Sequence, residues 1–132
     1  MKRIRVKTMS RIEMVDITGE IQKMLTLEDI NEGICLVYCP HTTAGVIINE
    51  HADPTVAEDI ANALSEQFPH RHSWRHLEGN ADAHVKTAMV GNSVMIPITA
   101  RRLALGTWQG IFFCEFDGPR NREVYVQFMS TE

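Results

Sequence analysis

Three histidines have a side-chain type suited to metal binding or proton transfer: His41 in "CPHTTAG", and His76 and His84 in "HLEGNADAH". Neutral imidazole is a common metal ligand, and three protein ligands with an open fourth position are typical of catalytic zinc. If the two stretches meet in the fold, these histidines predict one site for a divalent metal. Their spacing matches no local zinc motif, so a helix entrance with locally hydrogen-bonded histidines is the competing interpretation.

A short helix is predicted between two glycines, Gly79 and Gly91. With its start at Asn80 or Asp82, His84 lies in the first turn, where the positive end of the helix dipole keeps the imidazole neutral. The same helix start offers free backbone N–H groups that suit a phosphate or a carboxylate. Gly79 would let the backbone approach a ligand closely, and Gly91 would end the helix.

More polar side chains stand where predicted strands end, which is where a rigid scaffold presents groups to a cleft. Each also has an ordinary alternative role, such as a core histidine for His41 and a helix cap for Asp53. The polar residues at the two ends of the strand 43–50 are Thr42 and Thr43 after His41, and Asn49, Glu50, His51 and Asp53 at the far end.

Hydrophobic periodicity predicts one domain, residues 1–132, rich in strands. Because strands come in clusters instead of alternating with helices, we predict an α+β fold dominated by antiparallel strands. The apolar strand 32–41 is expected to be buried on both faces, and "DGPRNR" (117–122) is expected to form a hairpin turn. The predicted strands are 3–9, 11–18, 32–41, 43–50, 93–98, 103–116 and 122–129, and the predicted helices are 18–30 capped by Thr18, 53–68 capped by Asp53, and 80–91.

Composition excludes several classes of protein. The formal charge of -4 is mild and mixed along the chain, so we expect no nucleic-acid partner. No apolar run reaches the ~18 residues of a membrane span, so we expect no membrane partner and a cytoplasmic location. The odd set Cys35, Cys39 and Cys114 lies in apolar runs, which indicates reduced, buried thiols.

Four long stretches carry a resemblance to a known family: "HTTAGVIINEHADPTVAEDI", "HLEGNADAHVKTAMVGNSVMIPI", "RLALGTWQGIFFCEFDGPR" and the final strand. Together they resemble the YjbQ-like family, an uncharacterised protein family sometimes labelled secondary thiamine-phosphate synthase. The resemblance covers essentially the whole chain from the first strand. It implies a compact α+β barrel-like sandwich, a homotrimer, and an active-site pocket near the histidines.

The family's motifs map onto individual positions of this chain. Many members carry Asn where this chain has His51, so His51 is left out of the ligand set. The histidine of the family's "HT[TS]A" is His41, that before "EGN" is His76, that of "DAH" is His84, "GTWQ" is Gly106 to Gln109, and "E-x-D-G-P-R" supplies Glu115, Asp117 and Arg120.

The family label implies a transferase reaction that joins an aminopyrimidine diphosphate to a thiazole phosphate, with loss of pyrophosphate. This reaction needs cationic groups for the departing diphosphate and a polar pocket for the thiazole. A divalent metal on His41, His76 and His84 is expected to help, with zinc first and magnesium or manganese as alternatives. The expected contacts to a small, phosphorylated substrate are Thr42, Thr43, Asn80, Lys86, Gln109 and Arg120.

Two other functions stay open at this point. A metal-dependent hydrolase of a small phosphorylated or carbonyl compound would use the same histidines, with Glu50 or Asp82 as general base. A non-enzymatic trimer would bind only a metal or a metabolite. The candidate catalytic residues are therefore His41, His84, Glu50 and Asp82.

Overall fold

The structure is a computed structural model that describes residues 1–71 and 73–132. Eight strands and three helices lie within these residues, and every strand pair is antiparallel. The predicted α+β fold is thereby confirmed. In chain order the elements are β1 (Lys2–Lys7), β2 (Glu13–Asp16), α1 (Thr18–Thr26), β3 (Gly33–Tyr38), β4 (Ala44–Glu50), α2 (Pro54–Gln67), α3 (Ala81–Val90), β5 (Ser93–Thr99), β6 (Arg102–Leu103), β7 (Gln109–Glu115) and β8 (Asn121–Ser130).

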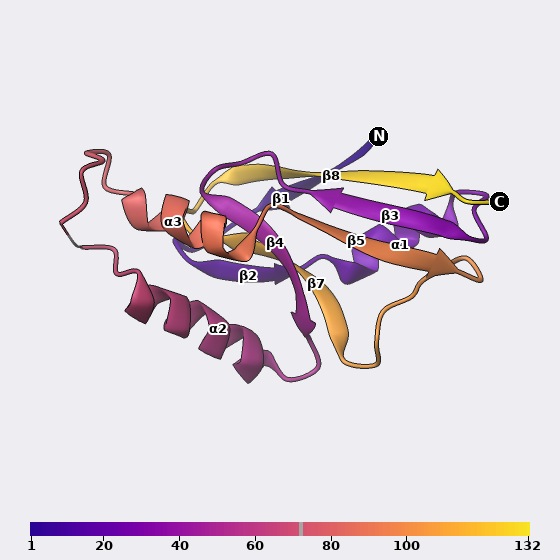
Figure 1. Cartoon of the computed structure of the whole chain (residues 1–132), viewed down its shortest axis with the longest axis horizontal. Helices are drawn as coiled ribbons and strands as arrows, with labels where there is room; N and C mark the ends of the chain where they lie inside the picture. The colour runs from indigo at the N-terminus through magenta and orange to yellow at the C-terminus, as the bar shows by residue number, and fades with distance from the viewer. Residues whose placement is uncertain (72) are drawn as a thin grey trace.

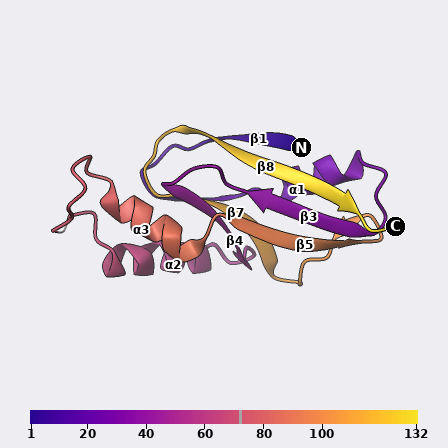
Figure 2. The same cartoon turned by 45° about the horizontal axis from the view of Figure 1, so that its top comes forward.

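Two sheets enclose the main hydrophobic core. The larger sheet has the strand order β1-β8-β3-β5-β6, and the smaller one has the order β2-β7-β4. Successive side chains of a strand point to opposite faces, so each sheet contributes alternate residues such as Val37, Val126 and Phe113 to the core. Helix α1 adds the fully buried Ile21 and Leu25. Figures 1 and 2 show β3 between β8 and β5: β8 and β5 run toward the end where the C-terminus lies, and β3 runs the opposite way.

The second face of the smaller sheet is covered by α2 and α3, which are both at the left of Figure 1. Phe112, Cys114 and Phe116 form this second core with Ala83 of α3, and Leu64 of α2 packs against it. The predicted helix 53–68 is confirmed: the Asp53 side chain accepts a hydrogen bond from the Thr55 N–H at 3.0 Å, and Pro54 is the first helical residue.

The prediction for helix 18–30 is wrong in its cap and its length. Helix α1 begins at Thr18, and the Thr18 side chain does not cap it. Instead the Asp16 Oδ1 accepts the Thr18 N–H at 3.0 Å. An aspartate two residues before a free N–H competes well for that bond, a local geometry that helix periodicity does not reveal.

Two further predictions fail between residues 103 and 122. The predicted strand 103–116 is broken, because Gly106 and Gln109 form a turn between β6 and β7: the Gly106 N–H donates to Gln109 Oε1 at 2.8 Å, and the Gln109 N–H donates to the Gly106 carbonyl at 3.1 Å. The segment 117–122 is also not a hairpin turn. It connects β7 of one sheet to β8 of the other, which are not paired.

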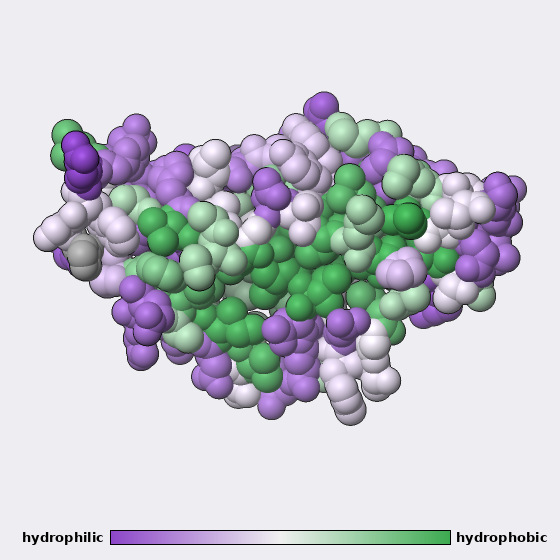
Figure 3. Space-filling model, in the orientation of Figure 1, coloured by the Kyte–Doolittle hydropathy of each residue, from purple (hydrophilic) through white to green (hydrophobic). Residues whose placement is uncertain are grey.

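Strand β3 is buried on one face only within a single chain. Cys35 and Val37 point into the core, whereas Tyr38 is 41% exposed and Met95, on neighbouring β5, is 63% exposed. Figure 3 shows apolar side chains gathered across this face. We name these residues the sheet-face patch: Ile34, Leu36, Tyr38, Met95, Pro97, Tyr125 and Met129, which the strand register places side by side.

Two predictions from composition can be compared with the structure. Cys35, Cys39 and Cys114 are buried and unpaired by disulfides, as predicted. Burial raises the pKa of the Cys35 and Cys114 thiols to about 12, so both are inert as nucleophiles. Among the described residues no helix is both long enough and apolar enough to cross a membrane.

Candidate functional site

A buried ion pair lies at the crossing between the two sheets. Glu115 ends β7 and is fully buried, and Arg122, near the start of β8, is 5% exposed. Arg122 donates from Nε to Glu115 Oε1 at 2.9 Å and from Nη2 to Glu115 Oε2. The carboxylate also accepts the Thr8 hydroxyl at 2.7 Å and the Asp117 N–H at 3.1 Å. Both carboxylate oxygens therefore have two donors each, which holds the crossing in one geometry.

These contacts lower the pKa of Glu115. Burial by itself would raise the pKa of this carboxyl group, but the hydrogen bonds from Arg122, Thr8 and Asp117, together with the Arg122 charge, outweigh it. The same Arg122 donates to Thr43 Oγ1 at 2.9 Å. Thr43, which was predicted to contact substrate, is buried and accepts this hydrogen bond from the ion pair. Its neighbour Thr42 is exposed.

Gly118 allows the segment between β7 and β8 to pass close to the end of β1. A Cβ atom at this position would lie 2.3 Å from the Ser10 carbonyl oxygen and 2.8 Å from both Glu115 Cγ and Thr8 Oγ1. Such contacts do not occur in folded proteins, so a side chain at 118 would push these elements apart. The glycine in "DGPR" is thus required by packing against the ion pair.

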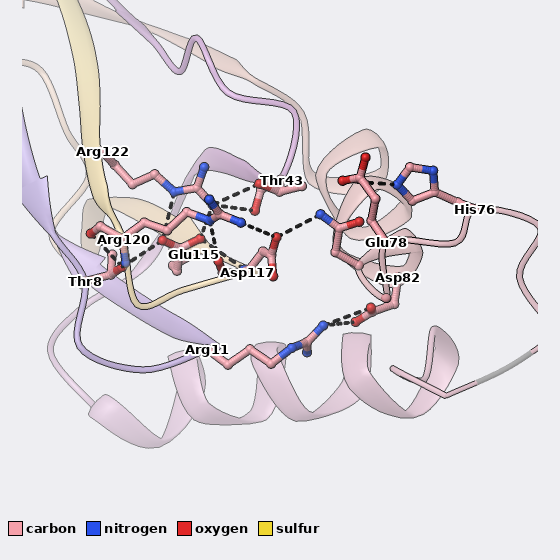
Figure 4. A network of polar contacts seen from close by, with 12 residues as sticks. Thr8, Arg11, Thr43, His76, Glu78, Asp82, Glu115, Asp117, Arg120 and Arg122 are labelled. Atoms are coloured by element: carbon pink, nitrogen blue, oxygen red, sulfur yellow. Dashed lines mark hydrogen bonds and ion pairs between the residues drawn. The ribbon is translucent and has the colours of Figure 1, made fainter.

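Asp117 links the ion pair to the entrance of α3 (Figure 4). Its Oδ2 accepts Asn80 Nδ2 at 2.9 Å and Arg120 Nη2 at 3.0 Å, and its carbonyl accepts Arg120 Nε at 2.8 Å. The Asn80 Oδ1 is buried without a hydrogen-bond partner among the described residues. Asn80 and Arg120, both predicted to contact substrate, are therefore brought together by the fold, and Arg120 remains half-exposed.

Asp82 is the shared partner of two cations in a buried charge cluster. Its carboxylate accepts Lys86 Nζ at 2.7 Å and Arg11 Nη2 at 2.9 and 3.1 Å. Burial alone would raise the Asp82 pKa, but the hydrogen bonds and charges of Lys86 and Arg11 bring it below its usual range. A carboxylate that accepts hydrogen bonds from two cations is a weak base, so this arrangement does not favour the predicted role of Asp82 as general base. Lys86, which was predicted to contact substrate, is 1% exposed and donates its hydrogen bond to Asp82.

His76 and His84 lie together at the start of α3. Their ring centroids are 5.3 Å apart with an interplanar angle of 82°, and His76 Nε2 is 3.8 Å from Glu78 Oε2. His84 lies in the first helical turn, as predicted. Over residues 1–71 and 73–132, however, no group of three or more His, Cys, Asp or Glu side chains is placed to hold a metal ion. Within one chain His41 therefore does not complete the predicted three-histidine site.

His41 instead lines an open pocket of about 670 Å³ beside the paired end of β1 and start of β8. Its Nε2 accepts the Glu123 N–H at 3.0 Å. Burial and the nearby Arg122 charge lower the pKa of His41, so the imidazole is neutral at pH 7. Arg5 and Lys7 line the same pocket, because alternate residues of β1 point to one face.

Glu50 and Gln109 lie at the opposite end of β4 from His41. The strand has seven residues, so its ends are about 20 Å apart at roughly 3.3 Å per residue. Glu50 pairs in register with Gln109 of β7. Within one chain neither residue reaches the His41 pocket, so the predicted cleft divides into two separate regions.

The whole chain also matches known proteins. Residues 2–131 match the family described as UPF0047 protein YjbQ-like. The chain belongs to this family. The UPF0047 protein YugU of Bacillus subtilis (strain 168) is 49% identical over 130 residues, covering 98% of each chain. A UPF0047 protein of Methanocaldococcus jannaschii is 51% identical over 125 residues, covering 95% of this chain and 91% of its own.

Solved structures agree with the YjbQ-like assignment and with the fold. A YjbQ/UPF0047 family protein from Clostridium acetobutylicum has a TM-score of 0.96 at 43% identity, covering 98% of this chain and all of that one. A protein from Aeropyrum pernix K1 has a TM-score of 0.94 at 39% identity, with 98% and 97% coverage. These two relatives are described as uncharacterised and hypothetical, so the family fixes the fold and leaves the activity open.

Four basic residues border the sites of this YjbQ-like chain and were not predicted from its sequence: Arg5, Lys7, Arg11 and Arg122. Arg5 and Lys7 could have been found, because the period-two pattern of "RIRVK" places them on one face of a strand. Arg11 and Arg122 had no such signal. Their partners Asp82 and Glu115 lie in other elements, and only the tertiary fold brings each pair together.

Proposed function

We propose that this chain is an enzyme acting on small phosphorylated compounds, with the phosphate groups bound in the His41 pocket beside the paired end of β1 and start of β8. The observation that carries the proposal is the neutral His41 beside Arg5 and Lys7 in that pocket. Neither cation forms an ion pair with any residue from 1–71 or 73–132, and Glu123 is the only acidic residue of the lining. The pocket thus favours an anionic ligand.

His41 supports this function as a hydrogen-bond donor. Its Nε2 accepts the Glu123 N–H, so a neutral ring carries its proton on Nδ1. A neutral imidazole donates a hydrogen bond to a phosphate oxygen without needing to titrate. Donors and cations fixed in place before the reaction stabilise charge that develops on a leaving group.

Among the candidate reactions, thiamine-phosphate synthesis matches these groups best. The thiazole nitrogen attacks the methylene carbon of the aminopyrimidine, the carbon–oxygen bond breaks, and pyrophosphate leaves with the electron pair. The protein must stabilise negative charge on pyrophosphate, for which Arg5, Lys7 and His41 are suited. The hydrolase needs a general base, and neither Asp82 nor Glu50 is available to His41 within one chain.

The histidines at residues 1–71 and 73–132 do not form a metal site within one chain. His76 and His84 face each other, but no third ligand joins them in the described part of the chain. We propose that a zinc ion, or magnesium or manganese in its place, takes His76 and His84 as two ligands and a third ligand, such as His41, from a second subunit. The non-enzymatic alternative is a trimer that only binds a metal or a metabolite. If it binds a metal, it needs the same ligands from two subunits, and in either case it shows no turnover.

The exposed sheet-face patch supports a homotrimer. An apolar sheet face of this kind is normally covered in a soluble protein, and a second subunit would bury it. We expect native mass spectrometry to give three times the chain mass of 15.0 kDa, with any bound metal visible as added mass. Met95→Lys in the patch should give monomers, whereas Met9→Lys, equally exposed but outside the patch, should leave the trimer intact. A wild-type monomer at micromolar concentration contradicts the proposal.

Binding of inorganic pyrophosphate tests the pocket without requiring turnover. We expect calorimetry to detect binding that weakens by roughly tenfold in Lys7→Gln, since a hydrogen bond to a charged group contributes about 1.5–3 kcal/mol and solvent screens an exposed one. Lys2→Gln is the matched control, because Lys2 lies on the same strand outside the pocket and pairs with Glu28. Equal affinity in the two variants would reject this pocket as the phosphate site.

A further inference from the structure

A second arrangement of polar groups lies at the other end of the smaller sheet. Strands β2 and β4 are both antiparallel to β7, so they run in the same direction and end at the same edge. Asp16 ends β2, and His51 directly follows β4. Their side chains meet across the start of β7, with His51 Nδ1 2.7 Å from Asp16 Oδ2.

The contacts around this pair fix both side chains. Asp16 Oδ1 accepts the Thr18 hydroxyl at 2.6 Å and the Thr18 N–H at 3.0 Å, and the His51 N–H donates to the Trp108 carbonyl at 3.0 Å. The imidazole packs over Gly110, where a Cβ atom would lie 2.4 Å from His51 Cγ. Any side chain at position 110 would displace the ring. The orientation of His51 is therefore built into the sheet.

This orientation determines where the imidazole can react. A carboxylate accepts a hydrogen bond and cannot donate one, so Nδ1 carries the proton shared with Asp16. The lone pair of Nε2 is then available to a ligand. An Asp–His pair of this kind either accepts a proton from a ligand or, once protonated, donates a strong hydrogen bond to it.

The pair borders an open pocket of about 770 Å³ that also contains a cation. Arg102 lines this pocket, and no carboxylate of the described residues pairs with it. Asp16, the only acidic residue of the lining, is already bonded to His51 and Thr18. Glu13 and Glu58 line a different, adjoining pocket that also contains Asp16 and His51. In the pocket with Arg102, an arginine and an imidazole favour an anion that can share a proton. A phosphate fits, because its second proton is exchanged at about pH 6.

We propose that Asp16, His51 and Arg102 form a second ligand site, which binds the phosphate group of a small molecule and exchanges one proton with it through His51 Nε2. In the bound state Arg102 pairs with the phosphate oxygens, and the proton lies between the ligand and the imidazole. This site is separate from the His41 pocket, since the two lie at opposite ends of β4. It does not depend on the proposed transferase activity.

NMR of the imidazole nitrogens, with inorganic phosphate added to the full-length protein, tests this site. We expect a saturable shift of the His51 Nε2 resonance, with an affinity that falls about tenfold or more in Arg102→Gln. Lys23→Gln, an exposed cation on α1 outside the pocket, is the matched control and should bind phosphate normally. Sulfate, which carries no exchangeable proton near neutral pH, should shift Nε2 far less than phosphate does.

Three outcomes would overturn the proposal: no phosphate-dependent shift at His51, an equal affinity in Arg102→Gln and wild type, or identical shifts with sulfate and phosphate. Asp16→Asn provides a second check, because an amide can donate to Nδ1 and place the proton on Nε2 instead. Nε2 can then no longer take a proton from phosphate, so its response to phosphate should fall to the size of its response to sulfate. The His41 resonance reports the other pocket independently. Lys7→Gln should therefore change the His41 response and leave that of His51 unchanged.

Discussion

Glu115→Gln is expected to lower the free energy of unfolding by about 3–5 kcal/mol, because it leaves the Arg122 guanidinium buried without its counter-charge. Arg122 is 5% exposed, and water cannot replace the lost carboxylate without opening the crossing between the sheets. Urea denaturation at pH 7 measures the change. Glu66→Gln, on the exposed side of α2, is the matched control and should stay within about 0.5 kcal/mol of wild type.

A double variant separates the buried charge from the loss of the bond. Replacing both partners, as in Glu115→Gln with Arg122→Met, removes the uncompensated cation and should recover much of the lost stability. If Glu115→Gln alone unfolds at the wild-type urea concentration, the ion pair does not hold the two sheets together. The same result would reject the structural role assigned to the "E-x-D-G-P-R" segment.

The pH dependence of stability follows from the same carboxylate. The folded-state pKa of Glu115 lies below the ordinary value of 4.5, so its contribution is fully present above that value. As pH falls below 4.5 toward the folded-state pKa, the contribution is lost. The wild type should therefore lose stability more steeply than Glu115→Gln in this acidic range. If the free energy of unfolding falls equally with pH in both proteins, Glu115 is not the group that makes stability sensitive to acid.

Structure that depends on local sequence was predictable. Asp53 followed by Pro54 marks the start of α2 because a cap and a fixed φ angle act within a few residues. Gly91 ends α3 with φ of 91°, a backbone angle that glycine adopts readily, and this signal is also local. Period-two alternation likewise located most strands, since it reports which face is buried and needs no knowledge of the partner strand.

Contacts between distant segments were not predictable from spacing. The turn after β7 was expected to pair its flanking strands, yet β8 joins the other sheet and carries Arg122 back to Glu115. Both ends of the strand 43–50 were treated as one cleft, although β4 separates His41 from Glu50. The three histidines were assigned to one metal site because of their side-chain type alone. The fold brings His76 to His84 and places His41 against β8 instead.

His41→Phe is expected to lower the rate of the proposed transferase reaction by roughly 10²–10³-fold, the usual cost of losing one fixed donor to a developing anion. Phenylalanine keeps a ring of similar size and removes the Nδ1 donor. Its effect on the fold is checked by thermal unfolding, because the Glu123 N–H loses its acceptor. His70→Phe, whose imidazole contacts the Gly79 carbonyl and does not line the pocket, is the matched control.

We propose that the pocket beside His41 stabilises a departing pyrophosphate, and the rate of pyrophosphate release measures this role. The purified protein is given the aminopyrimidine diphosphate and the thiazole phosphate, and pyrophosphate and thiamine phosphate are quantified together. We expect both products in equal amounts from the wild type and from His70→Phe, and a rate at least about 100-fold lower from a folded His41→Phe. No product from the wild type, or an unchanged rate in His41→Phe, would contradict the account.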